Sequence, residues 1–504
     1  MARAIALVAA LAVVVSSPVA RGQQTADAPA AQASLPVMSA ADARAFADAA
    51  AGRLDYLPGE VLVKFKDGVE TQAQQRALDV LRSRPAVDRL EWLGDVALLR
   101  DASQPDARVL ADQLASQPEV EYAQPNYLRR RSLTPNDASY ASRQWNLQTI
   151  DMPKAWDINP GGKSDVIVAV VDTGVTTFTG TLTARTWNGS AIQTITLPFA
   201  TNPDLSASRL ALPKDFVTGG GTIVLDTDGH GTHVSSTIGE DTNNSTLEAG
   251  IAYNVRIMPV KACASYWDVQ FAMSAAGVPG FADPDAGGCP TSAIADGIRY
   301  AVDNGAKIIN LSIGGEGSST LEQAAMQYAV DKGAFIAIAA GNAKLSGNPA
   351  QYPASYAPNL AGAMAVGATN RSGNRASYSS TGSYVEIAAP GGDPLDSDTA
   401  GSGFIWQSTL RLEATDPALV LFPRFDRYTE VGYAGTSMAS PHVAGVAALL
   451  YSQGITKPSA IEQAIKKTAK FLGTPSAADA TRNDEFGAGL VQPRTALFGL
   501  GLRK

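Results

Sequence analysis

The sequence predicts an α/β protein with a doubly wound, mostly parallel sheet flanked by helices, preceded by a small β-α-β-β-α-β unit. Four apolar runs of strand length lack the alternation of half-buried strands, so both of their faces are expected to be buried. They are residues 166–171, 255–260, 307–311 and 334–340. Helical patterns separate some of these runs, and strands that alternate with helices form parallel sheets.

Ordinary helix signals delimit two of the helical patterns. Residues 292–304 carry apolar side chains at helical spacing, and the glycine at 305 ends the pattern. Ser319 and Glu322 fit a capping box, in which each side chain bonds the backbone N–H of the other residue. The helix that follows is expected to end near Gly333. A further helical run covers residues 439–450.

The smaller unit is predicted from the order of its patterns between residues 52 and 127. The strand-like patterns are residues 60–66, 90–93, 96–99 and 120–123, and the helical ones are residues 71–82 and 106–116. This order is the split βαβ arrangement. Pro125 and the arginine run 129–131 mark an exposed boundary, and the run could instead be a processing site for a protease specific for basic residues.

Composition and charge limit the classes of function. The chain has 504 residues, 45% hydrophobic and 17% charged, which is enough for one large domain with a buried core and something smaller. The formal net charge of −8 argues against a nucleic-acid partner.

The first 22 residues read as a signal peptide. Arg3 precedes the apolar run 4–15 and then small residues, and this run is too short to span a bilayer. We therefore expect a secreted or extracellular protein without a membrane partner. Residues 23–51 have little bulky apolar content and are expected to be a weakly ordered leader.

The chain has two cysteines, Cys263 and Cys289. In an exported protein, two cysteines most simply form one disulfide. Two free buried thiols are the alternative. A metal pair is disfavoured because no histidine or third cysteine stands near them in the sequence.

Three segments place a reactive side chain at the end of a regular element. Asp172 follows a buried strand and precedes a glycine turn, His230 lies between glycines, and Ser437 stands at the start of a helical run. A serine hydroxyl needs a base within hydrogen-bond reach, and a buried carboxylate holds the base in the correct tautomer. A helix start also places backbone N–H groups beside a developing oxyanion. The three residues could form such a triad.

The order Asp, His, Ser along the chain is the order of subtilisin. The segments Asp172-Thr-Gly, His230-Gly-Thr-His233 and Gly435-Thr-Ser-Met-Ala-Ser-Pro-His442 resemble the three signature blocks of the subtilisin family. Residues 310–315, 339–342 and 486–491 resemble further family blocks. The resemblance covers residues 136–497.

The resemblance implies a serine endopeptidase with Asp172, His230 and Ser437 as its catalytic triad. It also implies that the Asn342 side chain completes the oxyanion hole. The expected substrate-binding residues are Ser312, Ile313, Gly314, Gly315, Ala340 and Gln351. Gln351 stands at the floor of the pocket for the residue before the scissile bond, where a neutral side chain predicts neither a basic nor an acidic preference.

Each assignment has a structural alternative. His233 competes with His230, and Ser440 with Ser437, while Asp226 and Asp228 are alternative carboxylates. Serine is a common helix cap, and aspartate and asparagine are common turn residues. The segment 312–315 could simply end a buried strand.

The resemblance extends to the smaller unit. Residues 57–66 and 120–126 resemble the family's pro-region, which assists folding and inhibits the enzyme until the enzyme cuts itself free. The expected organisation is a pro-region over residues 52–131 and a peptidase domain over residues 132–504, with the cut between Tyr127 and Leu133. We expect protein or peptide substrates, the pro-region as an intramolecular inhibitor, and a monomer.

No cofactor is expected for the chemistry, but a structural calcium ion is a family expectation. Its candidate ligands are Asp226, Asp228, Asp241 and Asn243. Three insertions are expected at residues 176–222, 263–289 and 391–431, where loops around the cleft could narrow substrate choice.

Two other functions compete with proteolysis. One is a catalytically silent pseudoprotease that binds peptides along residues 310–315. The other is a nucleotide-binding α/β protein, which the lack of a glycine fingerprint after the first strand opposes. Gly161-Gly-Lys-Ser164 lacks the glycine that a phosphate loop needs at position 157, which is aspartate.

Overall fold

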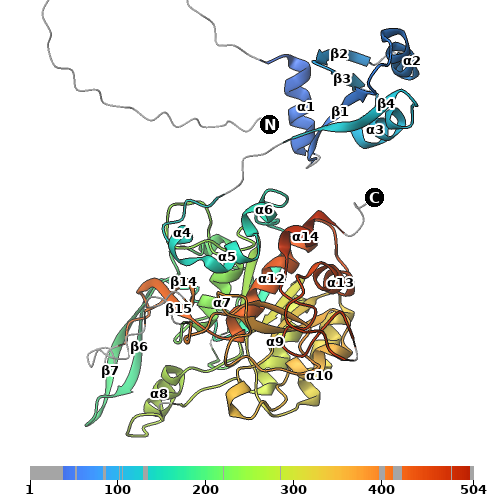
Figure 1. Ribbon diagram of the computed structural model, residues 1–504. Coiled ribbons are helices and arrows are strands. Elements are labelled where there is room, and N and C mark those ends of the chain that lie inside the picture. The colour runs from blue at the N-terminus through green and yellow to red at the C-terminus, as the bar shows by residue number, and fades with distance from the viewer. Residues whose placement is uncertain are drawn as a thin grey trace, which may run out of the picture. The chain divides into compact units, whose positions relative to one another are not determined.

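A computed structural model gives the fold (Figure 1). It describes residues 38–51, 54–82, 87–101, 103–104, 106–128, 134–219, 221–283, 285–396, 403–411, 423–477 and 479–499. The expected signal peptide, most of the expected leader and the arginine run 129–131 lie outside these residues. The chain divides into two compact units, Met1–Arg129 and Arg130–Lys504.

The first unit has a four-stranded sheet in the order β2-β3-β1-β4. Its elements are α1 (Ala40–Ala51), β1 (Tyr56–Phe65), α2 (Thr71–Arg82), β2 (Val87–Leu93), β3 (Val96–Asp101), α3 (Ala107–Ala115) and β4 (Val120–Tyr127). All of its strand pairs are antiparallel. β3 separates β1 from β2, so the predicted split βαβ arrangement is confirmed.

Helix α1 differs from the expectation of a weakly ordered leader, which is wrong for residues 40–51. The helix is built on alanines, and Ala45 and Ala49 are buried. The sequence contains no bulky apolar side chains at helical spacing there, which is why the pattern was missed. Arg100 of β3 is buried and pairs with Glu60 of β1 and with Asp42 of α1, so an ion-pair network joins this helix to the sheet.

The second unit is built around a seven-stranded sheet in the order β13-β12-β11-β10-β5-β9-β8. The strands are β5 (Ile167–Asp172), β8 (Lys214–Asp215), β9 (Arg256–Lys261), β10 (Ile308–Leu311), β11 (Phe335–Ala339), β12 (Ala363–Thr369) and β13 (Ile387–Pro390). Every neighbouring pair is parallel, so the predicted parallel sheet is confirmed. The four apolar runs of the sequence form β5, β9, β10 and β11.

Alternate residues of β5 enter two different hydrophobic cores, because successive side chains of a strand point to opposite faces. Val168 and Val170 pack with α7 (His230–Gly239) and α12 (Thr436–Ser452) on one face. Ile167, Ala169 and Val171 pack with α9 (Thr291–Asp303) and α10 (Thr320–Asp331) on the other. Helices on both faces explain why the strand has no polar alternation.

The second unit has further helices and strands, several of which also contribute buried residues to its core. They are α4 (Tyr140–Arg143), α5 (Trp145–Thr149), α6 (Met152–Trp156), β6 (Gly180–Trp187), β7 (Ile192–Phe199), α8 (Tyr266–Ala275), β14 (Ile405–Leu410), β15 (Tyr428–Tyr433), α13 (Pro458–Thr468) and α14 (Pro493–Phe498). The hairpin β6–β7, α8 and β14–β15 belong to the three expected insertions, and Figure 1 shows them gathered on one side of the second unit. A small core of their own includes Phe199, Leu410 and Phe425.

No helix within the described ranges is long and apolar enough to cross a membrane.

Candidate active site

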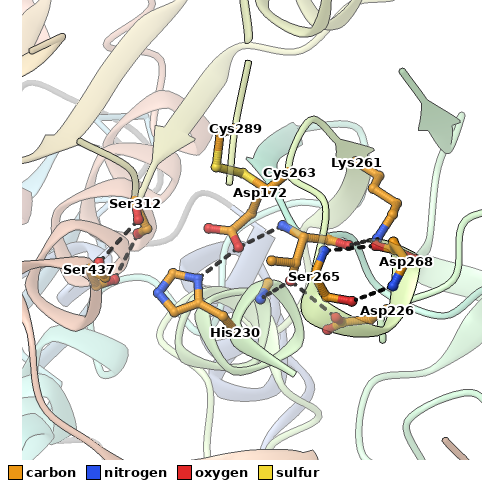
Figure 2. Close-up of a disulfide and its surroundings, with 12 residues drawn as sticks. Asp172, Asp226, His230, Lys261, Cys263, Ser265, Asp268, Cys289, Ser312 and Ser437 are labelled. Carbon is orange, nitrogen blue, oxygen red and sulfur yellow. Dashed lines mark hydrogen bonds and ion pairs between the residues drawn. A yellow bond between two sulfur atoms is a disulfide. The ribbon is translucent and has the colours of Figure 1, made fainter. Parts of the chain in front are cut away.

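Asp172 and His230 meet where β5 ends and α7 begins. The Nδ1 atom of His230 lies 2.7 Å from Oδ1 of Asp172, which also accepts a 2.7 Å hydrogen bond from the backbone N–H of Thr173. Figure 2 shows the imidazole ring between the Asp172 carboxylate and Ser437. Asp172 is fully buried, whereas the His230 side chain is 28% exposed. The carboxylate can therefore hold the ring while the opposite ring nitrogen stays accessible.

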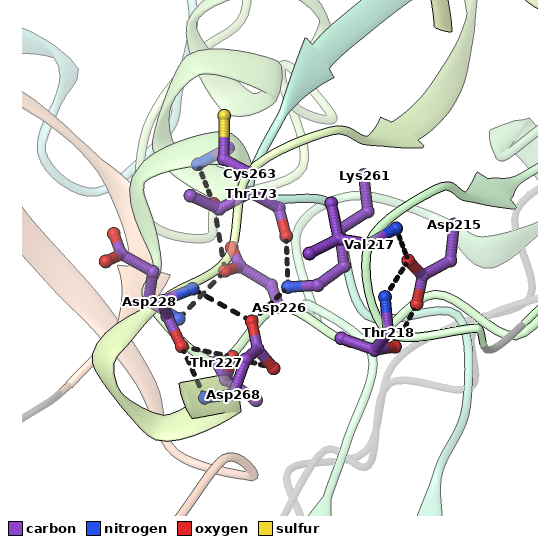
Figure 3. Close-up of polar contacts among 12 residues, drawn as sticks. Thr173, Asp215, Val217, Thr218, Asp226, Thr227, Asp228, Lys261, Cys263 and Asp268 are labelled. Carbon is purple, nitrogen blue, oxygen red and sulfur yellow. Dashed lines mark hydrogen bonds and ion pairs between the residues drawn. The ribbon is translucent and has the colours of Figure 1, made fainter. Parts of the chain in front are cut away.

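A second carboxylate, Asp226, fixes the turn that leads into α7 (Figure 3). Its Oδ1 accepts from the Thr173 hydroxyl and from the N–H groups of Asp228 and Gly229, and its Oδ2 accepts from Thr232. Because these bonds use both oxygens, Asp226 is a turn-forming residue and not the partner of His230. Sequence reasoning considered Asp226 as an alternative to Asp172 and as a calcium ligand, and missed this positioning role.

The backbone of the two segments approaches closely at Gly231. A Cβ atom on Gly231 would lie 2.4 Å from the carbonyl oxygen of Gly174, a distance that real side chains do not tolerate. Glycine after His230 is therefore required for α7 to reach the end of β5.

Negative charges determine the protonation of His230. Burial lowers the pKa of His230, but the charge and hydrogen bond of Asp172 and the charges of Asp228 and Asp226 outweigh it and raise that pKa to about 9. The ring is thus a strong base placed beside a fixed carboxylate.

The other two histidines are buried and neutral. His233 stacks on Tyr433, its Nε2 lies 3.1 Å from the Ile405 carbonyl oxygen, and burial lowers its pKa to about 3. His442 lies between the Met438 carbonyl and Asn146, and burial lowers its pKa to about 4. Neither histidine contacts a carboxylate in the described residues, so His230 is the one suited to act as a base.

Ser437 lies in the first turn of α12 and is partly exposed. Its hydroxyl donates a 3.0 Å hydrogen bond to the carbonyl oxygen of Ser312, and the Ser312 hydroxyl donates back to the Ser437 carbonyl at 2.7 Å. The competing Ser440 is fully buried and donates to Oδ1 of Asn310 at 2.8 Å. Of the two serines, only Ser437 is open to a substrate.

The Asn342 carboxamide is held in one orientation. Its Oδ1 accepts 2.9 Å hydrogen bonds from the backbone N–H and the hydroxyl of Thr436, and that hydroxyl accepts from the N–H of Gly341. The Nδ2 group is left as a donor beside the start of α12, where the first backbone N–H groups of a helix also lack helical partners. These donors could stabilise an oxyanion.

A cleft of about 780 Å³ joins these groups. Its lining includes Asp172, His230, Ser437, Asn342, Ser312, Ile313, Gly314, Gly315 and Gln351. Ala340 does not line it and was wrongly placed there: the residue is fully buried, its N–H donates to Val366 and its carbonyl accepts from Tyr384. Ala339, one residue earlier, lines the cleft instead, because side chains alternate along an extended strand.

Gly341 makes room for Gln351. A Cβ atom on Gly341 would lie 2.3 Å from Cγ of Gln351, and the backbone of Gly341 has a positive φ of 103°. Gly315 pairs with Tyr352, the residue after Gln351, through two backbone hydrogen bonds of 2.9 and 2.7 Å. The segment 312–315 therefore lies beside Gln351 in the cleft.

Cys263 and Cys289 form the expected disulfide and line the same cleft. The backbone N–H of Cys263 donates to the Asp172 carbonyl at 3.1 Å. The bridge therefore ties the loop between the two cysteines to the end of β5 (Figure 2).

Two of the candidate calcium ligands are already engaged by other groups of the protein. Asp226 is saturated by the hydrogen bonds given above, and Asp241 is paired with the guanidinium of Arg209 and bonded to Ser206. Within the described ranges, no group of three or more histidine, cysteine, aspartate or glutamate side chains is arranged to hold a metal. The residues named from the sequence thus do not support the expected calcium site.

A buried glutamate of the second unit, Glu248, predicts that the stability of the protein depends on pH. The Glu248 carboxylate is buried without a hydrogen-bond partner, and burial, Glu430 and Asp204 raise its pKa to about 8, against an ordinary 4.5. Between those values the unfolded chain releases a proton that the folded chain keeps, so stability falls as the pH rises. Glu248→Gln should therefore raise the melting temperature at pH 9 by roughly 4 °C or more and leave it nearly unchanged at pH 4.

The measurement compares melting temperatures in a Ser437→Ala background, which prevents self-digestion, and in a chelator, which removes cations that would neutralise the acid. Glu316→Gln, which removes an exposed carboxylate, is the matched control and should have no effect at either pH. Equal effects of Glu248→Gln at both pH values would contradict the assignment.

Comparisons with known proteins identify the family of the chain. The model of the subtilase family matches residues 163–489, and that of the fervidolysin N-terminal prodomain matches residues 42–126. A "Thermophilic serine proteinase" of Bacillus sp. (strain AK1) is 33% identical over 83% of this chain and 84% of that protein.

An "Extracellular protease" of Xanthomonas campestris pv. campestris is 32% identical over 74% of this chain and 59% of its own length. A solved protease structure from Pseudoalteromonas arctica covers 73% of this chain and 99% of that chain, with a TM-score of 0.50 and 27% identity. The family model covers well over half of the chain, and the Bacillus protein is similar over most of both chains. The chain belongs to the subtilase family of subtilisin-like serine endopeptidases.

Proposed function

We propose that the chain is a secreted serine endopeptidase that hydrolyses peptide bonds through an acyl-enzyme on Ser437. The observation that carries the proposal is the 2.7 Å contact between Asp172 and His230 in the same cleft as Ser437 and Asn342. Substrate backbone would add to the edge of residues 312–315, of which Gly314 and Gly315 are exposed, with Gln351 below the residue that precedes the scissile bond.

The reaction would begin when the Ser437 hydroxyl rotates from the Ser312 carbonyl to the free ring nitrogen of His230. His230 takes the hydroxyl proton while the serine oxygen attacks the substrate carbonyl, and Asp172 stabilises the imidazolium. Asn342 Nδ2 and the first N–H groups of α12 would bind the oxyanion. His230 then gives the proton to the leaving amine. In the second half of the reaction, water attacks the acyl group while His230 takes a proton from that water, and His230 then returns the proton to the Ser437 oxygen.

The first unit would be the pro-region of this enzyme, over residues 52–131, ahead of a peptidase domain over residues 132–504. A match of residues 42–126 to a subtilase prodomain supports this organisation. The enzyme would cut itself between Tyr127 and Leu133. Secretion is supported by the apolar run 4–15 and by the name of the extracellular Xanthomonas relative. Protein or peptide substrates and a monomeric enzyme are part of the same proposal.

One observation favours the alternative of a silent peptide-binding protein. The Ser437 hydroxyl is bonded to Ser312 and not to His230. Catalytic hydrogen bonds are often loose before substrate binds, so this bond alone does not exclude catalysis.

Burst kinetics separates the two proposals. An activated ester mixed with excess mature enzyme should release about one leaving group per active site before the steady state, because acylation precedes a slower deacylation. A silent binder would show no burst and no turnover while still retaining the peptide.

The pH profile of catalysis should follow the negative charges around His230. Only the neutral ring accepts a proton, so kcat/KM should rise with pH. The midpoint of this rising limb should lie above 6.5, the ordinary pKa of histidine. Asp228→Asn removes one of these charges but keeps an oxygen for the backbone N–H of His230, which Asp228 bonds at 3.1 Å. The limb should move down by about half a pH unit. A limb that stays or moves up would show that Asp228 does not act on the ring.

A further inference from the structure

Glu322 is a buried carboxylate in the cleft that the proposed mechanism does not use. Its exposed fraction is 3%, and it lines the same cleft as Asp172, His230 and Ser437. In the described structure its carboxylate accepts no hydrogen bond and forms no ion pair. Burial alone raises the pKa of this carboxyl to about 7. Buried carboxylates are normally paired, so an unpaired one beside a binding cleft points to a missing ligand.

The local explanation for Glu322 fails. The sequence predicts a capping box, and half of it exists, because the backbone N–H of Glu322 donates to the Ser319 hydroxyl at 3.3 Å. The return bond is absent, because the N–H of Ser319 donates to the Tyr356 hydroxyl at 2.6 Å, and that hydroxyl donates to the Ser319 carbonyl. Tyr356 thus takes the place of the carboxylate in the cap, and the carboxylate is left without a structural partner.

The charge of the cleft selects the kind of ligand. The lining contains the acids Asp172, Glu316 and Glu322, and the part of the chain that the structure describes contributes no lysine or arginine to it. A cationic side chain would pair with Glu322, whereas an acidic one would be repelled. Ile294 and Ile313 also line the cleft and could cover the aliphatic stem of a lysine or arginine.

The cleft edge gives a scale for the distance from the scissile bond. Ser312 contacts Ser437, and Gly315 stands three residues farther along the edge, about 10 Å away in an extended chain. Glu322 follows this edge and lines the cleft with it. The chain itself offers a matching substrate, since Arg129, Arg130 and Arg131 stand inside the segment where we propose the self-cut.

We propose that Glu322 is a specificity-determining residue that binds a lysine or arginine side chain of the substrate, about three residues before the scissile bond. This inference rests on the proposed endopeptidase function. It predicts a preference for lysine or arginine in the substrate. Gln351 does not supply this preference, because it is neutral and lies under the residue next to the scissile bond.

The test uses mature enzyme and peptides that carry either lysine or leucine at each of the four positions before the cut. The parent should cleave the lysine peptide with a kcat/KM about ten- to hundredfold higher at one position, chiefly through KM. Glu322→Gln keeps the shape of the side chain and should remove this preference, with the leucine peptide cleaved as before. Glu316→Gln, the exposed acid on the same cleft, is the control and should keep most of the preference.

Two outcomes would overturn the inference while the proposed function stands: a parent without lysine preference at any position, or a preference that survives Glu322→Gln. A parent that cleaves none of the peptides, and shows no acyl burst, would refute the proposed function and this inference with it. The melting temperature of Glu322→Gln supplies a check on folding and should not fall, because the carboxylate it replaces has no partner.

Discussion

Ser437→Ala should abolish both peptide hydrolysis and maturation. Without the hydroxyl no acyl-enzyme forms, and kcat should fall about 10⁶-fold, the order known for subtilisin itself. The expression product of the variant should keep its pro-region, whereas the parent should lose about 130 N-terminal residues, as expected from a cut between Tyr127 and Leu133. Intact masses of the two purified products measure this directly, and the mass of the parent also gives the mature N-terminus.

Ser440→Ala is the matched control, because Ser440 belongs to the same helix but is buried against Asn310. It should mature and cleave peptides, with at most a loss of stability. If parent and Ser437→Ala are cut alike, another protease matures the chain and self-cleavage is wrong. If neither is cut, the silent peptide-binding alternative gains support.

Asp172→Asn should reduce kcat by about 10⁴-fold, the order found for this replacement in serine proteases. Asn can still accept the 2.7 Å bond from the N–H of Thr173 through its oxygen. That oxygen would also face Nδ1 of His230, because Oδ1 of Asp172 serves both contacts, but a neutral amide offers no charge to the imidazolium. The other orientation of the amide would turn its NH₂ group toward the ring and stabilise the wrong tautomer of His230. Steady-state kinetics at pH 7 and pH 9, with thermal unfolding as a folding check, measures the loss.

Asp228→Asn is the comparison for that loss, because Asp228 lies beside His230 without bonding the ring. It should cost less than tenfold in kcat at either pH. A similar loss of kcat in both variants would mean that catalysis depends on the total negative charge around His230 and not on the 2.7 Å contact between Asp172 and the ring.

The fold was predictable because its main signals are local. The apolar runs that form β5, β9, β10 and β11 lack polar alternation since both faces of the sheet are covered. Helix α1 was not predicted from the sequence, because a helix built mostly of alanines shows little hydrophobic periodicity. The insertion elements, such as the hairpin β6–β7, were expected only as extra length.

The candidate site was predictable where a reactive residue stands at the end of an element, as Asp172, His230 and Ser437 do. Ala340 was misplaced because one residue along a strand reverses the direction of a side chain. Glu322 was hidden by a pattern with another meaning: a capping box in the sequence does not reveal that the Tyr356 hydroxyl takes the cap. Contacts between distant segments decide such cases.

Site-specific labelling tests the central claim most directly. A peptidyl diphenyl phosphonate reacts with a serine that a neighbouring base activates, and peptide mapping by mass spectrometry locates the adduct. We predict one adduct per mature enzyme, on Ser437, formed much more slowly in Asp172→Asn. An adduct on Ser440 or Ser312, or no adduct in a correctly folded enzyme, would contradict the assignment of Ser437 as the nucleophile.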